Sequence, residues 1–335
     1  LAGEMADVVG REAAEKDEIG RVLLPRLRDQ LAALVRTGRL NSVQRAAAGV
    51  ALGRLGDPRQ DVTCDVPVIV LIPRGEFIMG SERRKGQPGY DELSQWDDES
   101  TKAGAPFRLN LPAYRIGKYP VTVAQYRRFV EAGGYDPQES AAFWPGDGLD
   151  WLRKSGQQAP YYWDDPTWNV DNHPVVGVTW YEAVAYCAWL SATTGRRFRL
   201  PDEAMWEKAA RGTDGRRWPW GNEWDAPKLN SRDGGIGRTS AVGIFPTGRS
   251  PYEVFDCAGN VLEWCSGPGY SSGASYPFQP RPYTDKAYQE ELTSSAGTRA
   301  LRGGAWNGNG RGSRAAFRSY GDPLFRNGDV GFRVV

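Results

Sequence analysis

Two short stretches are Gly-Asn-Val-Leu-Glu-Trp at residues 259–264 and Leu-Arg-Gly-Gly-Ala-Trp at residues 301–306. They combine glycine with tryptophan, and this combination is typical of most of the chain. Beyond Pro58, short apolar runs such as residues 66–72 alternate with turns, and long helices are scarce. The 41 glycines and 23 prolines indicate much loop, but 13 tryptophans and 15 tyrosines supply anchors that disordered segments lack. We therefore expect short strands joined by long, ordered loops.

The first part of the chain has a different texture. From Arg11 to about Arg54, Ala, Leu, Arg and Glu dominate, and apolar residues recur at helical spacing. A second, shorter helix should end at Gly56-Asp57-Pro58, because glycine can cap a helix and proline cannot continue it. We predict a helical segment over residues 1–62, a HEAT-like helix pair from the end of a longer protein, followed by a domain over residues 67–335.

Two amphipathic helices are expected within the second domain, over residues 122–132 and 179–194. Each begins with a threonine, whose hydroxyl can cap the first free backbone N–H groups. Their apolar faces should pack into the core.

The charge balance and the cysteine count exclude several classes of protein. The 42 basic and 41 acidic residues give a net charge of +1, so no overall field attracts nucleic acid or an anionic membrane. No apolar run approaches the roughly 20 residues of a membrane span. Four scattered cysteines do not form a disulfide framework, which favours a reducing compartment. We expect a cytoplasmic protein without nucleic-acid or membrane partners.

Seven motifs occur along residues 67–335 in the order found in one protein family. They are FIMGS (77–81), YPVTVAQY (119–126), PVVGVTW (174–180), RLPDEAMWE (199–207), WPWG (218–221), GNVLEW (259–264), and LRGGAW (301–306) with GFR (331–333). This series resembles the formylglycine-generating-enzyme (sulfatase-modifying factor) family. The resemblance implies an α+β, C-type-lectin-type fold with a small twisted antiparallel sheet, two helices and much ordered loop.

The resemblance also bears on catalysis. The oxidase of this family uses two cysteines just after the Arg-Gly-Gly motif, which bind copper(I), whereas residues 306–314 here contain no cysteine. Another branch binds iron through several histidines, and this chain has only His173, for which we expect a structural or exposed place. Cys187, Cys257 and Cys265 should be small buried hydrophobes. We therefore predict that the chain is not an enzyme and has no catalytic residue.

The family holds calcium around the Gly-Asn-x-x-Glu-Trp turn, so the resemblance implies a structural calcium ion as the only cofactor. The side chains that match its ligands are Asp256 and Glu263, and the backbone oxygens are those of Cys257, Gly259 and Val261. A second site is expected at Asn230, although Asp233 does not align cleanly as its acidic partner. The alternative is that these residues only cap turns.

Residues 301–335 resemble the C-terminus of variable proteins of diversity-generating retroelements. In those systems a reverse transcriptase misreads adenines, so asparagine codons change to many types but not to Lys, Glu, Gln, Met or Trp. No Lys, Glu, Gln or Met occurs in this segment. Fifteen positions fit this pattern and are predicted to contact a ligand: Asn307, Gly308, Asn309, Gly310, Gly312, Phe317, Ser319, Tyr320, Gly321, Asp322, Leu324, Phe325, Asn327, Gly328 and Asp329.

Fixed anchors should hold these fifteen positions in place. We expect Trp306, Ala315 and Ala316 to pack inward, and five arginines to tie loops through backbone carbonyls: Arg302, Arg314, Arg318, Arg326 and Arg333. The contacts that dominate binding would come from Phe317, Tyr320, Leu324 and Phe325. The alternative is that Phe317 and Phe325 belong to the core.

The sequence thus predicts a non-catalytic, ligand-binding display protein whose C-terminal surface is diversified by a retroelement. The expected ligand is a protein, with a carbohydrate as the alternative. The helical segment indicates the sensor end of a larger bacterial receptor with N-terminal signalling domains. The alternatives are a catalytically inactive relative that acts as a fixed binding or scaffolding domain, or a formylglycine-generating oxidase.

Overall fold

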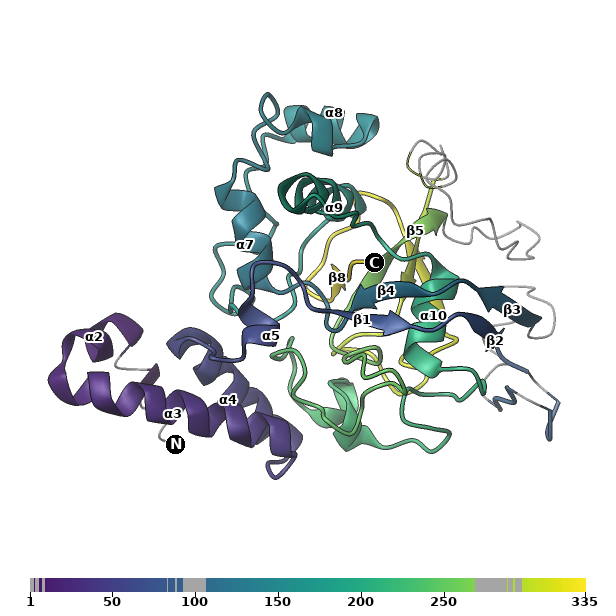
Figure 1. Cartoon of the computed structure of the whole chain (residues 1–335), viewed down its shortest axis with the longest axis horizontal. Helices are drawn as coiled ribbons and strands as arrows, with labels where there is room; N and C mark the ends of the chain where they lie inside the picture. Colours follow the sequence, from purple (N-terminus) through teal and green to yellow (C-terminus); the bar gives the residue numbers. More distant parts are fainter. Residues whose placement is uncertain are drawn as a thin grey trace.

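A computed structural model describes residues 10–82, 84–87, 89–92, 107–268 and 297–335, with Gly3, Ala6, Asp7, Tyr288 and Leu292 (Figure 1). The N-terminal part of the chain forms the helices α2 (Arg11–Lys16), α3 (Glu18–Thr37), α4 (Ser42–Leu55) and α5 (Gln60–Thr63). Helix α4 is capped at Asn41 and ends before Gly56, as predicted. Among the described residues, no helix is long and apolar enough to cross a bilayer.

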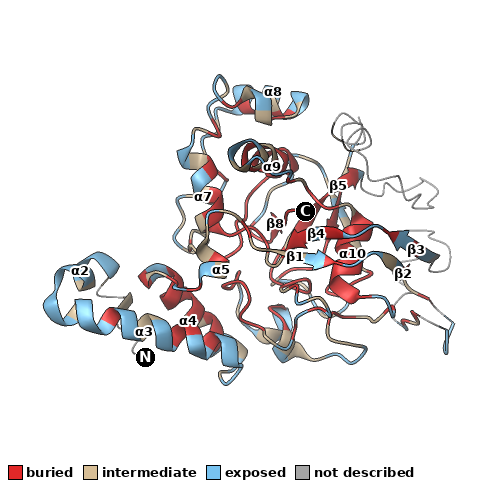
Figure 2. Cartoon of the chain, viewed as in Figure 1, coloured by how far each residue is buried: buried red, intermediate tan, exposed pale blue. Residues whose placement is uncertain are grey.

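Helix α4 packs directly against the rest of the chain. A Cβ atom on Gly49 would lie 2.9 Å from Cβ of Ala241, so only glycine permits this approach. Leu52 of α4 belongs to the same core cluster as Ile244 and Phe245. In Figure 2, α2 and the outer side of α3 are largely exposed, while α4 is mostly buried. The division into domains at residues 62–67 stays a prediction.

Within the described residues, the strands form three small sheets. β1 (Ile69–Ile72) pairs with β4 (Tyr114–Gly117), and β2 (Gly75–Met79) pairs with β3 (Phe107–Leu111). The third sheet has the order β7-β6-β5-β8 and consists of β5 (Leu262–Pro268), β6 (Arg299–Arg302), β7 (Arg318–Gly321) and β8 (Val330–Phe332). Its pairs are antiparallel except for β5 and β8, which are parallel. The expected α+β fold class is confirmed, with three sheets in place of one.

The two predicted helices of the second region are confirmed as α7 (Val123–Glu131) and α9 (Trp180–Thr194). Each begins after a threonine that forms a capping box, Thr122 with Gln125 and Thr179 with Glu182. The described residues contain further helices that the sequence did not predict: α8 (Gly146–Ser155), α10 (Glu203–Arg211), η1 (Ala141–Phe143), η2 (Ala226–Lys228) and η3 (Arg232–Gly234).

An aromatic core joins α7 and α9 to the third sheet. The rings of Tyr126 and Tyr186 are stacked with centroids 5.2 Å apart, and Phe332 of β8 packs edge-on against both. All three side chains are fully buried. Aromatic rings bury 150–250 Å² each, so this core supports the long loops that the small sheets alone could not hold.

Candidate ligand-binding site

The C-terminal segment, residues 301–335, turns sharply after β6. Gly304 has φ 68°, and a Cβ atom there would lie 2.6 Å from the backbone oxygen of Gly312. Glycine is therefore required for the loop after β6 to fold back on itself. This turn places residues 305–317 against the body of the protein and leads into β7.

Buried arginines hold this loop from below. Arg302 is fully buried and donates hydrogen bonds to the backbone oxygens of Ala315, Ala316 and Phe317. Arg302 also binds the carboxylate of Glu207 on α10. The predicted role of Arg302 as a tie between loops is confirmed.

The other predicted anchors divide into two groups. Arg314 donates to the oxygen of Arg311, and Arg333 donates to those of Gly117 and Phe255, as predicted. The carbonyl tie predicted for Arg318 stays a prediction, and Arg326 differs from the prediction because its hydrogen bond goes to a side chain. Arg318 binds the Glu203 carboxylate, whereas the Arg326 guanidinium lies over the Tyr161 and Trp151 rings and donates to Gln157. Ala315 and Ala316 are buried, and Trp306 is half-buried.

Helix α10 supplies carboxylates for the sheet above it. Burial alone would raise the pKa of Glu203, but the positive charges of Arg318 and Arg302 outweigh burial, so its pKa is lowered. Glu203 is therefore ionised at neutral pH. Together with Glu207 it fixes β6 and β7 to α10.

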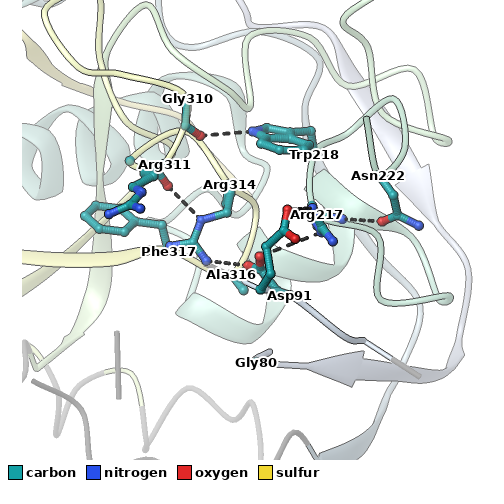
Figure 3. A network of polar contacts seen from close by, with 12 residues as sticks. Gly80, Asp91, Arg217, Trp218, Asn222, Gly310, Arg311, Arg314, Ala316 and Phe317 are labelled. Carbon is teal, nitrogen blue, oxygen red and sulfur yellow. Dashed lines mark hydrogen bonds and ion pairs between the residues drawn. The ribbon is translucent and has the colours of Figure 1, made fainter. Parts of the chain in front are cut away.

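A polar network ties the loop to residues 217–222 (Figure 3). Arg314 binds the buried carboxylate of Asp91, and Arg217 binds Glu92 at 3.0 Å. The Trp218 indole nitrogen donates to the backbone oxygen of Gly310 at 3.1 Å. The contacts of Arg314 and Trp218 do not depend on the side chains at residues 309 and 310. The Asn309 side chain adds contacts of its own, because its oxygen accepts hydrogen bonds from Arg311 N and Gly312 N.

The fifteen predicted contact positions lie at different depths. Seven are exposed: Asn307, Asn309, Tyr320, Asp322, Leu324, Phe325 and Asn327. Six are half-buried: Gly308, Gly310, Gly312, Phe317, Ser319 and Gly321. Phe325 is therefore not a core residue, and Phe317 is only partly covered.

The other two of the fifteen positions, Gly328 and Asp329, differ from the predicted contact surface, because both are buried. Asp329 accepts a hydrogen bond from the Asn307 side chain at 2.8 Å, and its backbone oxygen accepts one from Leu262 N of β5. Asp329 therefore supports the loop and the sheet rather than presenting its side chain outward.

A pocket of about 430 Å³ opens beside the exposed loop. Asn309, Gly310 and Arg311 form one wall, and the rings of Trp218 and Trp224 form another. The remaining lining residues are charged or polar: Glu92, Arg217, Asn222, Glu223 and Asp233. Sequence reasoning missed Trp224 as a site residue, although its nearness to the Trp-Pro-Trp-Gly motif offered a signal.

The predicted calcium turn is built differently from an open ion site. Both Glu263 carboxylate oxygens accept hydrogen bonds from Arg333, and one also accepts from the Trp206 indole. Asp256 accepts from the backbone nitrogen of Gly243 at 2.8 Å. The Glu263 carboxylate is therefore occupied by Arg333 and Trp206 in this structure.

The second predicted calcium position, Asn230, lies in a buried hydrogen-bonded cluster. Its side-chain nitrogen donates to Arg238 O, Ser240 Oγ and Asn260 Oδ1. Asp233 is exposed and lines the pocket instead. Across the described residues, no group of three or more His, Cys, Asp or Glu side chains is arranged to hold a metal ion. Calcium binding stays a prediction.

His173 and three of the four cysteines, Cys187, Cys257 and Cys265, are removed from solvent. His173 is fully buried with Nδ1 3.0 Å from Thr239 Oγ1, and burial lowers its pKa to about 3. Burial raises the pKa of the Cys257 thiol to about 12 and also raises those of Cys187 and Cys265. These groups are therefore neutral at physiological pH.

Comparison with known proteins places this arrangement in a family. Residues 55–335 match the family described as "Sulfatase-modifying factor enzyme 1-like domain". The chain belongs to this family. Its members include hercynine oxygenase of Mycolicibacterium smegmatis, which is 32% identical over 286 residues, covering 79% of this chain and 60% of that protein. The formylglycine-generating enzyme of Thermomonospora curvata is 32% identical over 233 residues, covering 59% of this chain and 70% of that protein.

Solved structures share the fold of this sulfatase-modifying-factor domain. PvdO from Pseudomonas aeruginosa has a TM-score of 0.56 at 22% identity, covering 81% of this chain and 94% of that chain. Treponema denticola variable protein 1 has a TM-score of 0.50 at 22% identity, covering 79% and 93%. The expected C-type-lectin-type fold is confirmed.

The relatives overturn the prediction that the chain is not an enzyme. Hercynine oxygenases from three mycobacterial species are 30–33% identical, and the formylglycine-generating enzyme is 32% identical. The missing cysteine pair bears only on the oxidase chemistry, so it does not separate this chain from the enzymes of the sulfatase-modifying-factor family. The chain spans 51–60% of the length of these oxygenases.

Proposed function

We propose that this domain binds a protein ligand through the exposed side chains of its C-terminal segment. The observation that carries the proposal is the exposure of Tyr320, Leu324 and Phe325, by 48%, 43% and 42%, within six residues of chain. Exposed apolar residues gathered in this way are typical of interaction sites, and aromatic residues contribute much of the energy at such sites. Asn307, Asn309, Asp322 and Asn327 add exposed polar groups around them.

The proposal extends to how this surface varies. The seven exposed positions carry residue types that adenine-directed change of asparagine codons can reach. Of the supporting residues, Arg302, Arg314, Arg333, Ala315 and Ala316 are buried. A variable protein from Treponema denticola has the same fold, which supports a similar use of this scaffold. We infer that a retroelement diversifies the surface and leaves the support unchanged.

We also place this domain at the sensor end of a larger receptor. The serine/threonine-protein kinase Pkn1 of Chlamydia trachomatis is 33% identical over 282 residues, and these cover 80% of this chain but 38% of that protein. A kinase that contains a similar domain supports a link between ligand binding here and signalling elsewhere in a longer chain.

Sequencing the DNA around the gene tests the diversification directly. The expected result is a near-copy of the codons for residues 301–335 beside a reverse-transcriptase gene, with adenines at the seven exposed positions. Absence of the near-copy, together with identical segments in sister isolates, would contradict diversification and favour a fixed binding surface.

A display library tests ligand binding independently of the genome. The chain is randomised at the seven exposed positions and selected on immobilised streptavidin as a defined protein target. We expect binders whose affinity disappears when their selected residues are restored to those of this sequence. Failure of such a library to yield any binder would contradict a ligand site on this surface.

A further inference from the structure

Two glycines of the C-terminal segment lie against tryptophan rings from other parts of the chain. A Cβ atom on Gly310 would lie 2.8 Å from two ring carbons of Trp224. A Cβ atom on Gly328 would lie 2.9 Å from a ring carbon of Trp168. Both distances are shorter than van der Waals contact, so any larger residue at either position must move the ring.

The backbone itself does not require glycine at these two positions. Neither Gly310 nor Gly328 has a positive φ angle, so each backbone conformation is open to ordinary residues. The obstacle at each position is a side chain rather than the path of the main chain. In contrast, a Cβ atom on Gly304 would meet the backbone oxygen of Gly312 at 2.6 Å.

The two rings differ in how freely they can move. Trp224 is 36% exposed and lines the pocket beside Asn309. Trp168 is more enclosed, because it is half-buried between Tyr162 and Trp306, at centroid distances of 5.6 Å and 5.8 Å. Gly321 provides the comparison, because its Cβ would lie 3.0 Å from Trp264. Trp264 is fully buried and its indole nitrogen donates to Val178 O, so that ring has no room to move.

We propose that Trp224 contacts the ligand, and that the side chain at position 310 sets the shape of the ligand site by displacing the Trp224 ring. This inference rests on the proposed function. With glycine at 310, the Trp224 ring covers the loop backbone and the pocket is bounded by that ring and Trp218. A larger residue at 310 turns the indole outward, where it offers an aromatic face to an apolar or aromatic side chain of a protein ligand.

Trp218 stays in place during this change. Its indole nitrogen is bound to the backbone oxygen of Gly310, an interaction that any residue at 310 retains. Its ring is 97% covered and packs against both Trp220 and Trp224, with centroids 6.2 Å and 5.5 Å away. The Trp218 ring is therefore constant while the neighbouring Trp224 ring moves.

Fluorine NMR of the fluorotryptophan-labelled full chain tests the displacement without any ligand. The Trp224 resonance is assigned with Trp224→Phe, and spectra of Gly310→Phe and Leu324→Phe are compared. We expect Gly310→Phe to shift the Trp224 resonance and to increase its response to a soluble paramagnetic quencher. The control Leu324→Phe adds the same ring at an exposed position of the same segment that does not line this pocket, and it should leave Trp224 unchanged. A Trp224 resonance that stays in place in folded Gly310→Phe would overturn the proposal.

A comparison with a buried ring separates displacement of Trp224 from a loss of the fold. Gly321→Phe should lower the unfolding midpoint, while Gly310→Phe should not, because Gly321 faces a ring that cannot move. Equal losses of stability at the two positions would contradict the distinction between the movable ring and the enclosed one.

Binding experiments then test whether the Trp224 ring contacts the ligand. Streptavidin binders are selected from the display library with position 310 also randomised, and Trp224→Ala is introduced into those with a large residue at 310. We expect a loss of affinity of roughly tenfold or more. Leu71→Ala, which truncates an exposed apolar residue on β1, is the control and should leave affinity unchanged.

The outcomes separate this inference from the proposed function. A library that yields no binders removes the proposed function and, with it, this inference. Binders that keep their affinity in Trp224→Ala leave the proposed function standing and overturn only the role of the ring.

Discussion

Arg333 and Glu263 form a two-pronged ion pair, with Nε 2.5 Å from Oε2 and a terminal nitrogen 2.6 Å from Oε1, and both side chains are fully buried. We expect Glu263→Gln to lower the free energy of unfolding by about 3–5 kcal/mol, because it leaves the Arg333 charge buried without its partner. Urea denaturation followed by tryptophan fluorescence measures this loss.

An exposed ion pair serves as the control for this measurement. The side chains of Arg108 and Glu76, on β3 and β2, are 63% and 51% exposed. Glu76→Gln should change the free energy of unfolding by less than about 1 kcal/mol, since water already solvates both charges. Similar losses in Glu263→Gln and Glu76→Gln would contradict the importance of the buried pair.

Glu182 should make stability depend on pH. Burial raises the pKa of this carboxyl above its ordinary value of 4.5, although Thr179 and Tyr135 donate hydrogen bonds to it. The folded state therefore binds the proton more tightly than the unfolded state, and this contribution to stability is lost as pH rises above 4.5. Relative to Glu182→Gln, which keeps the helix cap, the unaltered protein should become less stable as pH increases. A stability difference between the two proteins that is independent of pH would contradict the raised pKa.

His173 should stay neutral in the folded protein down to acidic pH. Its pKa is lowered to about 3 by burial and by the nearby charges of Arg238, Arg54 and Arg59. Stability that depends on the neutral ring is present above its ordinary pKa of 6.5 and is lost as pH falls below that value. Since the chain has one histidine, proton NMR shows a single imidazole. Its signals should not move between about pH 8 and pH 5, whereas a midpoint near 6.5 would show an exposed ring.

The exposed apolar side chains should contribute little to folding. Replacing Tyr320, Leu324 and Phe325 by serine, one at a time, should change the free energy of unfolding by no more than about 0.5 kcal/mol. Leu301→Ala, at a fully buried position on β6, should cost about 2–5 kcal/mol. Thermal unfolding of the four variants gives the comparison. Large losses at the three exposed positions would assign them to the core instead of to a binding surface.

The elements that the sequence predicted well have local causes. The capped starts of α7 and α9 depend on a threonine and a polar residue three positions later, and the end of α4 depends on Gly56 and Pro58. These features lie within a few residues of the structure that they determine. A single sequence is sufficient to read them.

Helix α10 was missed because its stability comes from distant partners. All nine of its residues are buried, including Glu203, Glu207, Lys208 and Arg211, so its polar side faces protein partners instead of water. Lys208 donates to backbone oxygens of Pro73 and Gly75, and Glu207 binds Arg302. A buried charge in a helix looks like a surface residue until its partner is known.

The sequence predicted which segment forms the candidate site, but not which of its residues are exposed. The codon pattern selected the exposed Tyr320, Leu324 and Phe325. It also selected the buried Asp329, because a codon pattern contains no information on burial. The tryptophans that border the loop, Trp168 and Trp224, lie far from it in sequence and could be identified only from the fold.

The carboxylates that support the C-terminal segment are encoded well upstream of it. Glu203 and Glu207 hold Arg318 and Arg302 from α10, and Asp91 holds Arg314. A mutational process confined to the last part of the gene cannot remove these acidic partners. Variants of this chain can therefore change their exposed side chains while these supporting carboxylates stay the same. A larger share of random variants should remain folded than if the loop supported itself.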